Sequence, residues 1–155
     1  MTVSLQHLLD ASIQLELNLA KLYTLFNDLF EEDEEFWWQL SMEERGHAAL
    51  LQQEKKDPSV VFPENLLAKD LEALNESNER IVGLIALFGK EPPARADAFD
   101  MALELELSAG ESHYQEFLDS PSESATANIF KQLNQEDRDH AERIRSYMVE
   151  AGIGS

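Results

Sequence analysis

The stretch EERGHA at residues 43–48 decides the fold, because it returns as EDRDHA at residues 136–141, 93 residues later. Residues three positions apart lie on one face of an α-helix, so an acid and a histidine at that spacing can reach one ion together. Each copy contains one such acid-x-x-His pair, Glu44 with His47 and Asp137 with His140. A lone pair would be a weak signal, but two pairs in register indicate an internal repeat.

A shorter repeat precedes each of these copies. The tripeptide LEL occurs at residues 15–17 and again at residues 105–107, an offset of 90 residues. The two offsets are nearly equal, so the chain has two similar halves, each with one glutamate, Glu16 or Glu106, ahead of an acid-x-x-His pair. This arrangement is typical of two helical hairpins related by a pseudo-twofold axis.

Helical periodicity extends outward from the repeats over most of the chain. Apolar residues at helical spacing predict four long helices at about residues 4–30, 31–56, 94–118 and 122–150, the last ended by Gly152. Scattered prolines and glycines at residues 57–92 predict a long crossover with one or two short helices. Two hairpins joined by such a crossover predict an all-α, ferritin-like four-helix bundle, with residues 1–155 as a single domain.

The polar residues of the repeats fall on apolar faces of these predicted helices. Glu16, for example, has apolar or aromatic residues three and seven positions before it and four and seven positions after it. The core-facing set comprises Glu16, Glu44, His47, Glu106, Asp137 and His140. Burying four carboxylates together is costly and raises their pKa values. Two divalent cations would balance the four negative charges, and two neutral imidazoles would complete the coordination.

Composition narrows the class of protein further. The 155 residues include 31 Asp and Glu against 12 Lys and Arg, a formal net charge of −19, which argues against nucleic acid and anionic membranes as partners. Cysteine is absent, so disulfides, thiolate metal sites and thiol catalysis are excluded. There is no signal-peptide pattern and no apolar run of about 20 residues, so we expect a soluble, cytoplasmic protein.

The motif Glu16-x-x-x-Ala20-x-x-Tyr23, together with the two acid-x-x-His pairs, resembles the ferritin-like rubrerythrin family over most of residues 4–150. The resemblance implies a di-iron site, with di-manganese or a mixed metal pair as an alternative. By position, its ligands would be Glu16, Glu44, His47, Glu106, Asp137 and His140. Among these, Glu44 and Asp137 would be the metal-bridging carboxylates.

The chain departs from the family pattern at three places. Asp137 stands where the family has glutamate, with the adjacent Glu136 as a second choice. Ala109 follows Glu106 at the position where many members have an additional carboxylate. The four-cysteine rubredoxin-type iron site of rubrerythrins proper is missing, so the electrons have to come from a separate donor protein.

The resemblance implies a non-haem di-iron oxidoreductase that reduces peroxide or dioxygen, with Glu44, Asp137 and Tyr23 at the reacting centre. Tyr23 has three possible roles: a hydrogen bond to a ligand, a redox-active phenol, or a core tyrosine with a satisfied hydroxyl. The same ligands also suit a ferroxidase that stores or detoxifies iron. A non-catalytic, metal-stabilised acidic interaction module is a candidate of another class, and Asp137 in place of glutamate favours it. The resemblance also implies a homodimer, for which Trp38 is a candidate contact while Trp37 belongs to the core.

Overall fold

The computed structural model describes residues 5–55, 64–119 and 125–153, and their side chains except at 5–6, 8–9, 54–55, 64–71, 108–119, 125–135 and 137–138. This part of the chain is all-α and contains no strand. Its helices are α1 (Leu5–Leu29), α2 (Glu34–Lys55), α3 (Glu64–Lys90), α4 (Arg95–Asp119) and α5 (Ala125–Glu150), with a short 3-10 helix, η1 (Glu31–Asp33), between α1 and α2. None of the described helices is long and apolar enough to cross a membrane.

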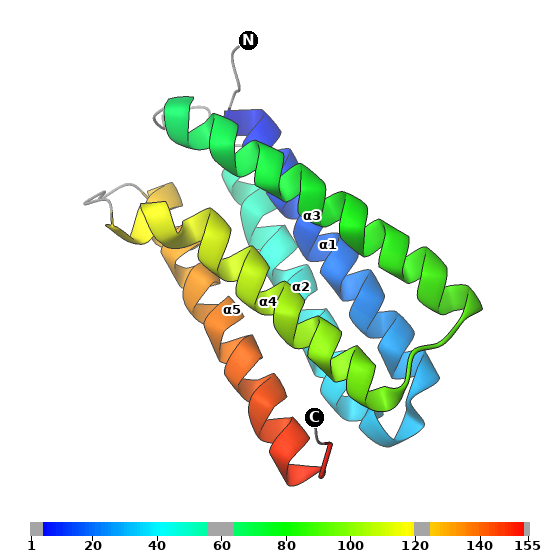
Figure 1. Ribbon diagram of the computed structural model, residues 1–155. Coiled ribbons are helices and arrows are strands. Elements are labelled where there is room, and N and C mark those ends of the chain that lie inside the picture. The colour runs from blue at the N-terminus through cyan, green and yellow to red at the C-terminus, as the bar shows by residue number, and fades with distance from the viewer. Residues whose placement is uncertain (1–4, 56–63, 120–124, 154–155) are drawn as a thin grey trace.

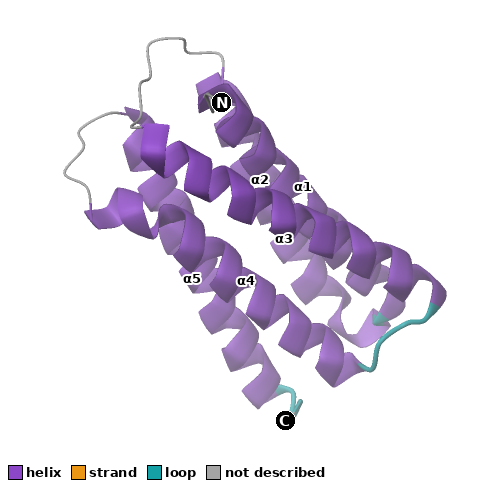
Figure 2. Cartoon of the chain, turned by 45° about the horizontal axis from the view of Figure 1, so that its top comes forward, coloured by secondary structure: helices purple, strands orange, loops and turns teal. Residues whose placement is uncertain are grey.

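The helices lie side by side along one elongated body, and each helix runs opposite to the one before it in the chain (Figure 1). α1 packs against α2, α4 packs against α5, and α3 lies along α1 and also contacts α4. α2 and α5 meet along a seam that joins the two pairs. The turn between α1 and α2 and the link between α3 and α4 lie at the same end of the molecule (Figure 2). The four long helices predicted from periodicity correspond to α1, α2, α4 and α5.

The prediction of one or two short helices in residues 57–92 was wrong, because α3 is one continuous helix of 27 residues. Leu74, Ile81 and Phe88 recur every seven residues and are all buried, so they form an apolar stripe along α3. Gly83 and Gly89 lie on the exposed side, where each costs about 1 kcal/mol relative to alanine. Burial of the three large side chains outweighs that cost.

A polar contact pins α3 to α1 within this apolar packing. The Asn78 side chain donates a hydrogen bond to the backbone carbonyl of Ala11, with Nδ2 3.0 Å from the oxygen. The same amide accepts a hydrogen bond from Asn18 Nδ2, also at 3.0 Å. These bonds satisfy half-buried polar groups and fix the position of α3 along α1.

Aromatic side chains form the core at one end of the molecule. Trp37 is fully buried, and its ring centroid lies 4.5 Å from that of Phe99 on α4 and 4.9 Å from that of Phe26 on α1. Tyr147 on α5 stacks on Phe36 with a centroid distance of 4.3 Å. Because these rings come from α1, α2, α4 and α5, the aromatic core holds the two helix pairs together.

A buried carboxylate, Asp33, closes the same end of the molecule. Arg95 at the start of α4 binds it through two parallel hydrogen bonds, with donor–acceptor distances of 2.8 and 2.6 Å. Tyr147 donates a third, from its hydroxyl to Oδ1 at 2.7 Å. We call these three residues the Asp33 clasp, because they join the α1–α2 turn to α4 and α5.

α5 ends just before the glycine that the sequence indicates, Gly152. Gly152 has a φ of +70°, a left-handed conformation that glycine adopts without steric cost. The Ile153 N–H donates to the Met148 carbonyl at 2.8 Å, and the Gly152 N–H donates to the Val149 carbonyl at 3.3 Å. This pair of bonds is a Schellman motif, so the prediction that Gly152 ends the last helix is confirmed.

Candidate metal centre

Five of the six predicted ligands meet in the interior of the molecule. All five side chains are buried, and they come from four different helices: Glu16 from α1, Glu44 and His47 from α2, Glu106 from α4 and His140 from α5. The sixth, Asp137, has its side chain outside the described residues. The apolar faces that carry these residues bring them together, since each helix turns that face toward the others.

Glu16, Glu44 and His47 form what we call the first ligand group. One ligand atom from each of the three residues can be chosen so that all lie within 4.8 Å of one another. His47 Nδ1 lies 3.4 Å from Glu16 Oε2 and 3.6 Å from Glu44 Oε2. Both α1 and α2 therefore contribute to a cluster that an ion could fill.

Glu44, Glu106 and His140 form the second ligand group, and their ligand atoms lie within the same 4.8 Å limit. His140 Nδ1 lies 2.8 Å from Glu44 Oε1 and 3.4 Å from Glu106 Oε1. Glu44 thus belongs to both groups, with Oε2 toward His47 and Oε1 toward His140. Each oxygen of this one carboxylate therefore faces a different group.

The outer nitrogens of the two imidazoles face further carboxylates. His47 Nε2 lies 2.6 Å from Glu136 Oε2 on α5, and His140 Nε2 lies 3.6 Å from Glu43 Oε1 on α2. Each histidine therefore faces a glutamate from the opposite helix. Carboxylates at this position orient an imidazole and leave its other nitrogen directed at the ligand groups.

Glu43 was not among the predicted site residues, and Glu136 was only a second choice as a ligand. The repeat carried a usable signal, because Glu43 and Glu136 occupy equivalent positions, 93 residues apart, beside the predicted bridging residues. Arg143 was missed as well. It binds Glu43 through two hydrogen bonds of 2.8 Å each.

Tyr23 donates a hydrogen bond to a candidate ligand. Its hydroxyl lies 2.6 Å from Glu106 Oε1, and the side chain is fully buried. The ring stacks on Trp37 with a centroid distance of 5.6 Å. This geometry matches both a hydrogen bond to a candidate ligand and a core tyrosine with a satisfied hydroxyl.

The electrostatics of the centre fit a site for cations. Burial and the negative charge of Glu44 raise the pKa of Glu106 to about 7. Burial lowers the pKa of His47, but Glu16 and Glu44 outweigh it and raise the pKa to about 11. His140 follows the same rule, since Glu106, Glu43 and Glu44 outweigh burial and raise its pKa. With no ion bound, protonated imidazoles therefore supply the positive charge that these buried carboxylates require.

The donor set also fits a metal ion. Within the described side chains, neither oxygen of Glu44 accepts a hydrogen bond of regular geometry, and the same is true of Glu106 Oε2. Buried acceptors usually receive regular hydrogen bonds, whereas the oxygens of Glu44 face imidazole nitrogens only as ion-pair partners. Carboxylate and imidazole without sulfur suit iron, manganese and zinc. These buried glutamate and histidine groups could hold a metal ion.

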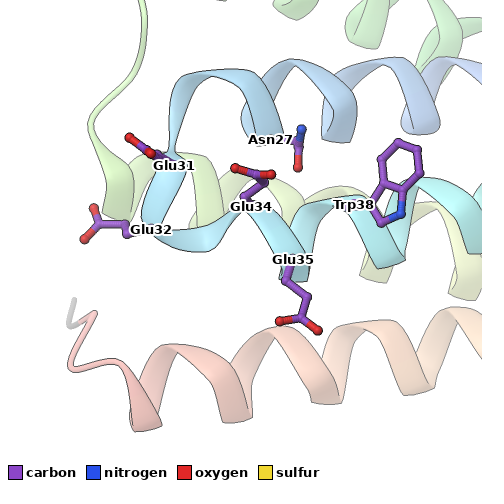
Figure 3. A pocket seen from close by; sticks show the side chains of 6 residues that line it. All are labelled: Asn27, Glu31, Glu32, Glu34, Glu35 and Trp38. Carbon is purple, nitrogen blue, oxygen red and sulfur yellow. The ribbon is translucent and has the colours of Figure 1, made fainter.

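A large open depression lies away from the ligand groups, beside the turn between α1 and α2. Figure 3 shows the residues that line it: Asn27, Glu31, Glu32, Glu34, Glu35 and Trp38. Its four glutamates belong to the acidic run that covers η1 and the start of α2, and Trp38 is 50% exposed. None of the candidate ligands lines this depression.

A scan against protein-family models, a search of curated proteins and a search of solved structures each found no match to the chain. Its function is therefore inferred from its sequence and its geometry.

Proposed function

We propose that the chain is a ferritin-like protein of the rubrerythrin type that reduces peroxide or dioxygen at a pair of iron ions. In this proposal α1, α2, α4 and α5 form the four-helix bundle, and α3 is its long crossover. The observation that carries the proposal is that two buried Glu/His groups share one carboxylate, Glu44. A glutamate with one oxygen toward each group can serve two ions at once, as in a di-metal centre built inside a four-helix bundle.

Bound iron would supply the electrons for the reduction by cycling between Fe(II) and Fe(III). The residues of the chain would hold the ions and orient their ligands. Glu44 would be a ligand of both ions, Tyr23 orients Glu106 through its hydrogen bond, and Glu136 orients His47. In this proposal Asp137 is the second bridging carboxylate. The aromatic core around Trp37 limits the access of water and with it side reactions.

Electrons have to reach the centre from another protein in this proposal. The chain contains no cysteine, so it cannot hold a thiolate iron site of its own. We therefore expect a separate electron donor.

Metal analysis of protein purified without chelator tests the proposal. After anaerobic loading with Fe(II), we expect about two irons per chain, as the shared-carboxylate pattern requires. His140→Ala should lose both the binding and the turnover of peroxide. Clearly substoichiometric iron after loading would contradict the proposal, and so would full activity in the His140 variant.

A ferroxidase that stores or detoxifies iron is the second candidate, and one observation favours it. An open depression lined by carboxylates includes His140 in its lining, so surface carboxylates that can attract cations lie next to the candidate centre. Rapid mixing of the Fe(II)-loaded protein with peroxide and with dioxygen separates the two functions. Iron that stays bound through repeated turnovers indicates the oxidoreductase, whereas oxidised iron that leaves the protein indicates the ferroxidase.

The same metal analysis and turnover assays test two more functions. Manganese in place of iron would indicate a di-manganese catalase-type activity, which the same ligands support. The acidic depression beside Trp38 favours a non-catalytic interaction module. Stable metal binding without any turnover would support that interaction module.

We also propose a homodimer, as the resemblance implies. Trp38 and Met42 lie one turn apart on the outer side of α2 and are about half exposed, at 50% and 46%. Sedimentation of the wild type and of Trp38→Lys would show whether a dimer forms and whether this side of α2 takes part.

A further inference from the structure

A second depression opens over the seam between α2 and α5, directly above the metal centre. It is lined by Glu43, Glu136, Asp139, His140, Glu142 and Arg143. Four carboxylates surround a single guanidinium there, so the depression has a negative potential. Potentials of this sign raise the local concentration of cations and the rate at which they arrive.

The floor of this depression is the imidazole of His140. The residue is only 1% exposed, yet its ring takes part in the lining. Nδ1 faces Glu44 and Glu106 on the inner side. Nε2 faces Glu43 at 3.6 Å without a hydrogen bond of regular geometry to any described group. One aromatic ring therefore separates the surface from the second ligand group.

The rim of the depression also contacts the first ligand group. Glu136 is 38% exposed, and its Oε2 lies 2.6 Å from Nε2 of the buried His47. Glu136 therefore connects the surface depression with His47, a buried residue of the first ligand group. Two carboxylates, Glu43 and Glu136, stand between solvent and the two imidazoles.

An ion pair crosses the depression from one helix to the other. Arg143 on α5 occupies both carboxylate oxygens of Glu43 on α2, and the two side chains are 35% and 38% exposed. The guanidinium repels an approaching cation and blocks the oxygens that would bind it. Because both side chains are partly exposed, water can take over their hydrogen bonds when the pair opens.

We propose that divalent cations reach the metal centre through this depression, with Glu43 and Glu136 as transient ligands and the Arg143–Glu43 ion pair as the gate. This inference rests on the proposed function, since it takes the two ligand groups as the destination. It adds the route and the residue that controls it.

The rate of Co(II) uptake tests the route. Co(II) bound to histidine and carboxylate absorbs visible light, so stopped-flow absorbance reports its arrival without any enzyme turnover. Asp139→Lys reverses a charge on the lining, and Glu150→Lys makes the same change on an exposed part of α5 outside the depression. We expect Asp139→Lys to slow uptake about tenfold at low salt and Glu150→Lys to change it less than about twofold.

The gate is tested by a second matched pair. Arg143→Gln should speed uptake severalfold, whereas Arg80→Gln should not, because Arg80 pairs with Glu104 and neither residue belongs to the lining. All these differences should shrink at about 1 M salt, where charges are screened beyond about 3 Å.

The outcomes separate the route from the function. Wild-type protein that binds no Co(II) would overturn both the function and the route. Normal binding of about two ions, with the same uptake rate in all four variants, would overturn the route and leave the function standing.

Discussion

Glu44 presents one oxygen to each ligand group, so its removal has a different effect from the removal of any other ligand. We expect Glu44→Gln to lose both ions, because each site lacks a charged ligand. Glu16→Gln should lose only one ion, since the second ligand group does not contain Glu16. Titration with Co(II) measures the number of ions bound per chain.

Glutamine has nearly the volume of glutamate, so neither substitution should disturb packing. Glu104→Gln, at an exposed position on α4, is the control and should bind as the wild type does. Equal losses in Glu44→Gln and Glu16→Gln would contradict a shared carboxylate.

Tyr23 contributes to stability through its hydrogen bond to Glu106. Tyr23→Phe keeps the ring and its stacking on Trp37 but removes the donor from a buried carboxyl group. We expect the ion-free variant to lose about 1–3 kcal/mol of unfolding free energy. Urea unfolding in the presence of chelator measures this loss, and an unchanged midpoint would show that the bond contributes nothing.

The sequence was informative about which residues enter the site and less so about what they touch. Glu44 and His47 share a helix face by their spacing alone, so their association could be predicted. The contact of His47 with Glu136 depends on how α2 and α5 are rotated against each other. That rotation is set by packing of the whole core, which no local spacing encodes.

At the scale of helices, the Asp33 clasp joins three segments and should be worth more than an exposed ion pair. Arg95→Ala leaves the carboxylate of Asp33 buried without its main partner, and we expect a loss of about 2–3 kcal/mol. Arg80→Ala removes the exposed pair with Glu104 and should cost about 1 kcal/mol or less. Urea unfolding of both variants tests the difference.

The clasp also predicts a pH dependence. Burial raises the pKa of Asp33, but the hydrogen bonds from Arg95 and Tyr147 outweigh it, so the pKa lies below its ordinary value of 3.8. A carboxylate with a lowered pKa stabilises the folded state above its unfolded pKa and loses this effect as the pH falls through the folded value. The difference in unfolding free energy between wild type and Arg95→Ala should therefore be largest at neutral pH and should disappear as the pH falls below 3.8. A difference in unfolding free energy that increased in acid would contradict this role of the Asp33 carboxylate.

The helices themselves were predictable where apolar residues recur at regular spacing, as in α1 and α5. α3 was not, because Gly83 and Gly89 interrupt its pattern. A Cβ added at either position would meet nothing within 4 Å, so close packing does not require glycine there. The stripe of Leu74, Ile81 and Phe88 was present in the sequence, but only its burial against α1 shows that it decides the structure.

At the scale of the whole molecule, bound ions should stabilise the folded chain. With a net charge of −19 the folded chain repels itself, and ions that bind only the folded state shift the unfolding equilibrium. An ion at about 100 times its Kd contributes about 2.7 kcal/mol, so two ions should raise the Tm by about 10 °C or more. Calorimetry with Co(II) and with chelator measures the shift. Glu44→Gln is the control and should show almost none.

The two ligand groups differ in where their residues come from along the chain. The first takes all three from α1 and α2, whereas the second also requires Glu106 and His140 from α4 and α5. Hairpins form early in folding because their contacts are local, and docking of distant segments comes later. The first ligand group can therefore form as soon as α1 and α2 have paired. The second can form only after this pair has docked on α4 and α5. For the proposed two-ion centre we therefore expect the first ion to bind while the chain is still folding and the second to bind only when folding is complete.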